Sequence, residues 1–268
     1  MMLAQDGPAL GIFTAGSVAA FFALLVICGL VYMMIQRARA GLKIPEIRKI
    51  AGLEAIDEAI GRATEMGRPV HFTPGLGDPY NIQTIASYAM LGHVAKRCAQ
   101  YDTRLLQTNV DPFVLAINNE VIRQAYLEAG RPDAFNPDDI TFHSTEQFAY
   151  AASVLGLYER ERPAANIMFG AFWAESMLFA EGGAYLGSIQ IGATANTHQI
   201  AFFVAACDYT LIGEEMFAAS AYLSKEPVLT GTVVGQDWAR IGVFALIILG
   251  TILAQIGDTN WLATILKK

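Results

Sequence analysis

A long run without charged side chains near the N-terminus most constrains this chain. Residues 9–35 contain no Asp, Glu, Lys, Arg or His. As an α-helix rising about 1.5 Å per residue, the run is long enough to cross the roughly 30 Å hydrocarbon core of a bilayer. We predict a transmembrane helix over 9–35, after a short outer tail over 1–8. The alternative, a cleaved signal peptide, is disfavoured because the run is too long and no basic region precedes it.

A second uncharged run lies near the C-terminus, over residues 241–257. It is short for a membrane span, but Trp238 and Trp261 beside it suit the two bilayer interfaces. We predict a second transmembrane helix over 238–257 and an interfacial tail over 258–268. The composition agrees with a mixed membrane and soluble protein, because 54% of the residues are hydrophobic and only 16% are charged.

Basic residues beside the first predicted helix set the expected orientation. Cytoplasmic segments next to a membrane helix carry an excess of Lys and Arg. We therefore expect a two-pass protein of a prokaryotic plasma membrane whose main domain is cytoplasmic, with Cys98 and Cys207 reduced. Lys267 and Lys268 in the tail argue mildly against this topology. Five basic residues follow the helix and none precedes it: Arg37, Arg39, Lys43, Arg48 and Lys49.

Short apolar runs alternate with helical stretches between the two predicted spans. This alternation predicts an α/β fold over 67–237, a mostly parallel, Rossmann-like sheet with helices on both faces. The expected strands are 69–73, 104–108, 140–142, 166–169, 187–191 and 200–205. The expected helices are 82–99, 112–129, 145–160, 172–181 and 213–223.

An amphipathic linker helix is expected over 36–66, before the sheet. Its apolar residues recur at helical spacing among Glu and Arg. Two later helices have well-marked starts. Asp111 followed by Pro112 is typical of an N-cap, and Ser144 with Gln147 matches a capping box.

The stretch 163–211 permits two interpretations. It has no Lys or Arg, so a third membrane segment is one alternative. Glu175 interrupts its first half and glycines interrupt its second half before any run reaches about 18 residues, which favours buried central strands and a subunit interface instead. Residues 182–187 are expected to form a mobile, uncharged loop that places Tyr185 at a contact with another subunit.

Polar residues after the predicted strands mark the expected binding crevice, because ligands of open α/β sheets bind outside the carboxyl ends of the strands. Gly75 and Gly77 would let backbone N–H groups approach a phosphate or another anion. The spacing matches neither the dinucleotide nor the P-loop motif, and a plain strand-to-helix turn is favoured. The candidate residues are Thr73, Gly75, Gly77, Asn109, Asp111 and Ser144, with Asn196, His198 and Glu214 in comparable positions.

We predict no catalytic set, metal site or resident cofactor. The four histidines, His71, His93, His143 and His198, show no i, i+4 spacing. His71 and His143 would need the strand ends to bring them to Glu146 or Glu175. Ser144 beside His143 lacks the GxSxG motif. Glu214 and Glu215 are better explained by a helix N-terminus than by an acid pair. A largely aromatic stripe could line a cofactor site, but such a stripe usually packs in the core. It consists of Phe169, Phe172, Trp173, Met177 and Phe179.

Several strings together resemble a family of bacterial and archaeal membrane proteins known as a domain of unknown function. The resemblance spans about 44–240 and implies a membrane-attached α/β domain, with no activity to carry over. The strings are RATEMGRPVHFTPG (62–75), FAYAASVLG (148–156), ANIMFGAFWAES (165–176), CDYTLIGEEMFAASAYLSKEP (207–227) and GQDWAR (235–240).

The net negative charge of the segment between the predicted membrane spans limits the kinds of partner that it is expected to bind. Residues 44–237 carry 23 acidic and 12 basic side chains, a net charge of −11, so non-specific binding of nucleic acid or anionic lipid is not expected. The leading hypothesis is a membrane-anchored scaffold or assembly subunit that contacts the lipid bilayer and forms homo-oligomers or binds other membrane protein subunits. A small-residue ridge, Gly11, Ala15, Ala19 and Ala23, would allow close helix packing. The alternatives are a nucleotide or small-anion sensor and a membrane-attached hydrolase or transferase.

Overall fold

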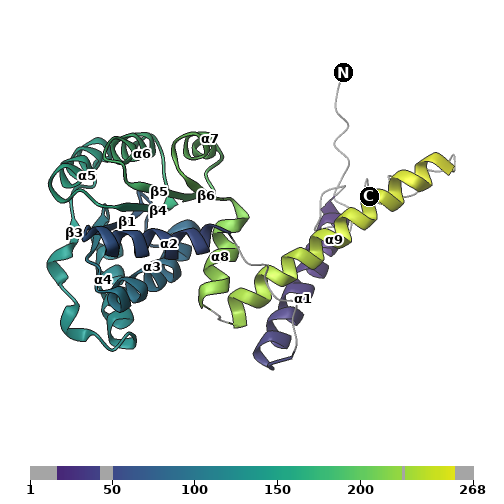
Figure 1. The fold of residues 1–268 in the computed structure, drawn as a ribbon. Helices are drawn as coiled ribbons and strands as arrows, with labels where there is room; N and C mark the ends of the chain where they lie inside the picture. Colours follow the sequence, from purple (N-terminus) through teal and green to yellow (C-terminus); the bar gives the residue numbers. More distant parts are fainter. Residues whose placement is uncertain (1–16, 43–50, 225–226, 257–268) are drawn as a thin grey trace, which may run out of the picture. The chain divides into compact units, whose positions relative to one another are not determined.

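The chain divides into two compact units in the structure, which is a computed structural model. It describes residues 17–42, 51–224 and 227–256. One unit combines Met1–Ile47 with Lys225–Lys268, and the other is Arg48–Ser224. The first contains the two long apolar helices, and the second is an α/β unit (Figure 1).

Six strands form the sheet of the α/β unit, in the order β3-β2-β1-β4-β5-β6. All neighbouring pairs are parallel. This is the strand order of the Rossmann fold, so the expected fold class is confirmed. The strands are β1 (Val70–Gly75), β2 (Leu105–Asn109), β3 (Ile140–Phe142), β4 (Ala165–Ala171), β5 (Ile189–Thr194) and β6 (Tyr209–Ile212).

Helices cover both faces of this sheet (Figure 1). Val70 and Phe72 of β1 belong to the core beneath one group of helices, whereas Leu106 and Met168 belong to the core beneath the other. Strands covered on both faces read as continuous apolar runs. The first group is α2 (Ala51–Met66), α3 (Ile82–Tyr101), α4 (Pro112–Glu128) and α8 (Glu214–Ser224). The second is α5 (Gln147–Glu161), α6 (Glu175–Tyr185) and α7 (Thr197–Ala206).

Two of the predicted helix starts differ in outcome. The Asp111 side chain accepts hydrogen bonds from the backbone N–H groups of Phe113 and Val114, which confirms the N-cap of α4. The capping box at Ser144 is wrong. The Ser144 hydroxyl accepts from the N–H of Glu146 and forms a local turn, while Gln147 donates to Glu175 in another segment.

The expected strand over 200–205 is also wrong, because these residues lie in helix α7. A short apolar run has no period that separates a buried strand from a helix. The start signal is Asn196, whose side chain accepts from the N–H of His198. The strand that completes the sheet is β6, which follows α7 and was not expected.

The stretch 163–211 forms the buried strands β4 and β5 with helices α6 and α7, which confirms the buried central strands of the favoured interpretation. The mobile loop expected over 182–187 is wrong, because helix α6 continues to Tyr185. The structure also differs from the linker helix expected over 36–66. Residues 43–50 lie outside the described residues, and α2 packs Leu53, Ile56 and Ile60 into the core of the sheet.

The other unit contains α1 (Ser17–Arg39) and α9 (Pro227–Ile256), which pack against each other. Two glycines one turn apart make this contact close. A Cβ atom at Gly231 would lie 2.7 Å from the Cα of Ile35, and one at Gly235 would lie 2.9 Å from the Cα of Val31. Small residues in such a spacing let helix backbones approach. The ridge expected from Gly11 to Ala23 falls partly outside the described residues.

Both helices are long and apolar enough to cross a membrane, over Phe21–Arg39 and Pro227–Ile252. The second begins well before the expected position 238. Only 11% and 12% of the two spans are buried, so most of their apolar surface is uncovered, unlike that of a core helix in a soluble domain.

Candidate functional site

The carboxyl edge of the sheet, formed by the turns after the strands and the starts of the helices that follow, contains the expected crevice. The order in which strands are added to the sheet reverses between β1 and β4, which lie side by side and parallel. Thr73 and Asn109 are fully buried there, whereas Asp111 and Ser144 hold the local turns described above. The structure thus brings the predicted residues to one edge, with two of them beneath its surface.

Gly75 and Gly77 serve close contacts within the chain. Gly75 has φ +78°, and a Cβ atom there would overlap the carbonyl oxygen of Ala171. A Cβ atom at Gly77 would overlap the hydroxyl of Thr84. The N–H of Leu76 donates to the same Ala171 carbonyl at 2.8 Å. The glycines therefore let the end of β1 lie against β4, and no basic side chain stands in this turn.

Beneath this edge, a chain of buried hydrogen bonds connects β1, β2 and helix α5. The Tyr150 hydroxyl lies 2.7 Å from Thr73 Oγ1 and 2.8 Å from Thr108 Oγ1. The Thr73 hydroxyl also accepts from the N–H of Gly75 at 3.1 Å. Burial raises the pKa of Tyr150 to about 12, so its hydroxyl keeps its proton.

The same chain continues through His71, the second residue of β1. Its Nε2 lies 3.0 Å from Thr108 Oγ1, and its Nδ1 lies 3.2 Å from the hydroxyl of Tyr158. Burial lowers the pKa of His71 to about 3, so the ring is neutral. A hydroxyl beside an imidazole is the arrangement of an activated nucleophile. Here His71 and Thr108 are fully buried, so they do not face a substrate.

Glu175 carries a buried carboxyl group and is the first residue of α6, shortly after the end of β4. Its Oε1 accepts from the N–H of Trp173 at 2.9 Å, and its Oε2 accepts from Gln147 Nε2 at 2.6 Å. Burial raises the pKa of Glu175 above its usual value. The carboxyl group joins the first residue of α5 to the turn before α6. The aromatic stripe is divided here, because Phe172 is core whereas Trp173 is exposed.

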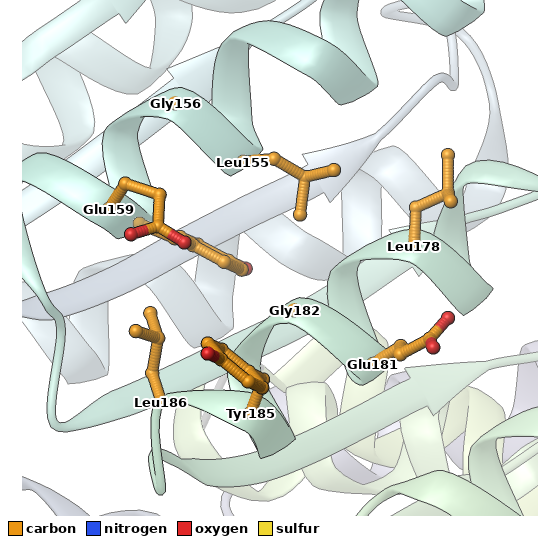
Figure 2. A pocket seen from close by; sticks show the side chains of 9 residues that line it. Leu155, Gly156, Glu159, Leu178, Glu181, Gly182, Tyr185 and Leu186 are labelled. Carbon is orange, nitrogen blue, oxygen red and sulfur yellow. The ribbon is translucent and has the colours of Figure 1, made fainter.

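A pocket of ≈ 420 Å³ lies between α5 and α6 (Figure 2). It lies towards the amino edge of the sheet, because the C-terminal parts of both helices form it. Leucine side chains form much of its wall, and Tyr185 stands beside it with 85% of its surface exposed. The pocket is lined by Leu155, Gly156, Tyr158, Glu159, Leu178, Glu181, Gly182, Tyr185 and Leu186.

Next to this pocket, two buried amides lie under helix α6. His71, Asn166 and Gln190 stand side by side on β1, β4 and β5. The side-chain amides of Asn166 and Gln190 have no hydrogen-bond partner within the part of the chain that the structure describes. A Cβ atom at Gly183 would overlap both amides. The middle of this face of the sheet is therefore polar, and only glycine fits at position 183 of α6, directly above the two amides.

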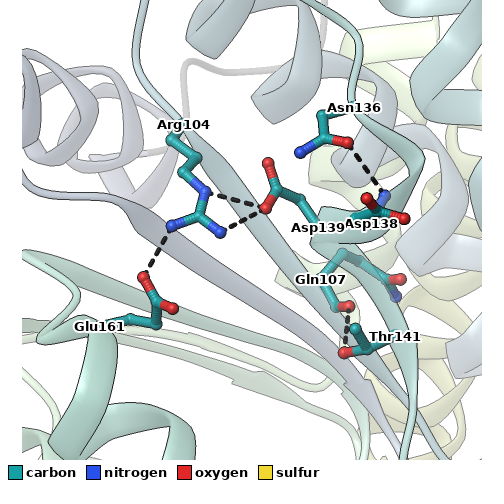
Figure 3. A network of polar contacts seen from close by, with 7 residues as sticks. All are labelled: Arg104, Gln107, Asn136, Asp138, Asp139, Thr141 and Glu161. Atoms are coloured by element: carbon teal, nitrogen blue, oxygen red, sulfur yellow. Dashed lines mark hydrogen bonds and ion pairs between the residues drawn. The ribbon is translucent and has the colours of Figure 1, made fainter.

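An ion-pair network fixes the amino edge of the sheet (Figure 3). Arg104 precedes β2, and its Nε and Nη2 donate to Asp139 Oδ1 at 2.8 and 2.6 Å. Its Nη1 donates to Glu161 Oε2 at 2.7 Å. The hydrogen bonds to Asp139 and the charges of both acids raise the pKa of Arg104. The network joins the starts of β2 and β3 to the end of α5.

These features define a class: a Rossmann-like α/β protein with a long apolar helix on each side of its α/β segment. The chain belongs to the family described as a domain of unknown function, DUF6754, whose sequence profile matches residues 8–265. No curated protein and no solved structure matches it.

Proposed function

We propose that the protein is a membrane-anchored assembly subunit whose α/β unit associates with copies of itself. The observation that carries the proposal is Tyr185, a highly exposed aromatic side chain beside a leucine-lined pocket. A two-fold contact would let Tyr185 of each copy enter the pocket of the other. Buried aromatic anchors of this kind dominate the energy of protein interfaces.

The membrane anchor is supported by the length of α1 and α9 and by their exposed apolar surface. The orientation is supported by Arg37 and Arg39 in the last turn of α1, on the side that leads to the α/β unit. We propose the plasma membrane of a prokaryote, with this unit in the cytoplasm. The partners would be the bilayer, further copies of the chain and other membrane subunits.

The other two functions lack a supporting observation. An anion sensor at Gly75 and Gly77 would need space that the contacts with Ala171 and Thr84 occupy. A hydrolase or transferase would need an accessible nucleophile, whereas the hydroxyl–imidazole pair of Thr108 and His71 is buried.

Self-association is tested with Tyr185→Asp in the full chain, purified in detergent. We expect the dimer dissociation constant to rise at least about thirtyfold, the effect of losing an anchor worth about 2 kcal/mol. Tyr101→Asp, at an exposed tyrosine on α3, is the matched control and should leave it unchanged. Circular dichroism confirms folding. A strictly monomeric wild type, or an unchanged dissociation constant in Tyr185→Asp, would contradict the proposal.

Orientation is tested with Asp133→Cys, at an exposed position of the α/β unit. Cys28 and Cys207 are first replaced by Ser, because they are exposed and partly exposed, whereas Cys98 is buried. A membrane-impermeant maleimide should label the new thiol only after the cells are opened. Labelling in intact cells would reverse the proposed topology.

A further inference from the structure

Large apolar side chains are exposed along the carboxyl edge of the sheet. The exposed fractions are 89% for Tyr80, 74% for Phe113, 68% for Phe148 and 44% for Trp173. Each lies at or near the start of the helix that follows a strand. Ile82 and Met177 are exposed in the same region. Solvated helix starts do not need such residues, so their exposure indicates a contact surface.

These side chains follow four strands that are neighbours in the sheet. Phe148 comes after β3, Phe113 after β2, Tyr80 after β1 and Trp173 after β4. Parallel strands end at one edge and stand about 4.8 Å apart, so the four strand ends extend over roughly 15 Å. We call Tyr80, Phe113, Phe148 and Trp173 the aromatic edge.

Among residues 51–224, acidic side chains lie at both edges of the sheet, whereas Lys and Arg do not lie at the aromatic edge. Asp78, Asp111 and Glu146 lie in the turns at the aromatic edge. Within residues 51–224, every Lys and Arg lies instead in the body or last turns of a helix, in the loop just after a helix, or just before a strand, away from that edge. They are Arg62, Arg68, Lys96, Arg97, Arg104, Arg123, Arg131, Arg160 and Arg162.

The acidic groups also have local roles that fix their positions. Asp78 Oδ1 accepts from the N–H of Tyr80, and Asp111 Oδ1 accepts from the N–H of Phe113. Each of these two carboxylates is therefore held two residues before an exposed aromatic residue. Glu146 precedes Phe148 in the same way, without a side-chain capping bond.

We propose that the aromatic edge binds a basic segment of a partner protein, one in which Lys or Arg alternates with apolar residues. Carboxylates and aromatic faces both attract Arg and Lys, by ion pairing and by cation–π interaction. The same charges repel phosphates, nucleic acid and anionic lipid. This surface is distinct from the Tyr185 pocket towards the opposite edge, so the inference goes beyond self-association.

The test uses the full chain in nanodiscs of zwitterionic lipid and a fluorescein-labelled octapeptide of alternating Arg and Leu. Its twin with Glu in place of Arg is the charge control, and empty discs correct for binding to lipid. Fluorescence anisotropy should show saturable binding of the basic peptide, and binding of the acidic peptide at least about tenfold weaker. Equal binding of both peptides, or no binding, would overturn the proposal.

Variants locate the site. Tyr80→Ser and Phe113→Ser should each weaken peptide binding at least about tenfold. Tyr101→Ser is the matched control and should bind like the wild type. Tyr80→Ser carries little risk of unfolding, since its ring is almost wholly exposed. Equal losses in the control would overturn the assignment.

The charge and the type of partner are tested separately. Glu146→Gln should weaken binding about threefold, whereas Glu65→Gln at the end of α2 should not. Tyr185→Asp should bind the peptide normally, which distinguishes failure of this surface from failure of self-association. Displacement of the peptide by an equal concentration of spermine would indicate a site for a small polyamine and would overturn the protein-segment proposal.

Discussion

The imidazole of His71 and the hydroxyl of Tyr158 are buried hydrogen-bond partners, with 3.2 Å between Nδ1 and the hydroxyl oxygen. The other ring nitrogen contacts the hydroxyl of Thr108. A neutral imidazole has one donor and one acceptor, so its tautomer decides which hydroxyl donates and which accepts. His71 therefore sets the direction of the hydrogen-bond chain that reaches Gly75.

Acid should destabilise the α/β unit through His71. Its pKa is about 3 in the fold and near 6.5 when the chain is unfolded, so only the unfolded state gains a proton as the pH falls through this range. The free energy of unfolding is thus highest above about 6.5 and decreases towards 3. The contribution lost between pH 7 and pH 5 is about 2 kcal/mol.

The measurement is urea unfolding of the full chain in detergent, with wild type compared to His71→Asn at both pH values. The stability advantage of the wild type should shrink at pH 5. His198→Asn, at an exposed histidine, is the control. A constant difference across this range would show that His71 does not account for the acid sensitivity.

Glu175 should act in the opposite direction. Burial raises its pKa, so the fold prefers the neutral carboxyl group, and stability is lost as the pH rises from about 4.5 through the raised value. The unfolding free energy of the wild type relative to Glu175→Gln should therefore decrease between pH 4 and pH 7. Exposed Glu181→Gln should show no such trend. An increase for Glu175 would contradict the assigned cause.

Two glycine substitutions should change stability with opposite signs. Gly61 lies inside α2 with nothing near its missing Cβ atom, so Gly61→Ala should raise the free energy of unfolding by about 1 kcal/mol. Gly183→Ala forces a methyl group onto Asn166 and Gln190 and should lower it by about 1–3 kcal/mol. Thermal unfolding measures both. Stabilisation by Gly183→Ala would mean that α6 does not lie in close contact with the side-chain amides of Asn166 and Gln190.

The pairing of α1 and α9 should depend on Gly231. Gly231→Val would place methyl groups against the backbone of Ile35 and cost about 1–3 kcal/mol of helix packing. Gly242→Val is the control, because no atom lies within 4 Å of its missing Cβ atom. Disulfide trapping between cysteines introduced on the two helices reports the pairing. Equal trapping in both variants would show that the close approach is dispensable.

The parallel sheet covered by helices follows from the alternation of apolar runs with helical stretches, because such units assemble into α/β folds. The order of its six strands was not part of that prediction and comes from the structure. Residues 200–205 show a case in which the apolar pattern does not predict the element, because they were expected as a strand and lie in helix α7. Ile, Phe and Val in a short run suit a central strand and an apolar helix equally well. Asn196 is the local signal for the helix, but in the sequence alone an Asn at this position suits an N-cap and a binding crevice equally well.

The crevice shows a second limit of sequence reasoning. Position at or just after the end of a strand places Thr73 and Asp111 at one edge, but it does not tell which side chain faces solvent. Thr73 is buried by the hydroxyl of Tyr150, a partner 77 residues away. Gly77 looks suited to a phosphate until the contact with Thr84 is known. Such long-range packing has no signature in a single sequence.

The contact of Gly231 with Ile35 also bears on how the molecule assembles. The two helices that meet there are separated by the entire α/β segment, so their pairing closes a loop of about 200 residues. Most contacts within the α/β unit join elements much closer in sequence, and such contacts form faster. During synthesis, α1 emerges long before its partner, and the face of α1 that contacts α9 stays unpaired until α9 follows. The packing of α1 against α9 can therefore form only after the whole α/β segment has been synthesised. A nascent chain released before α9 is made would leave α1 unpaired.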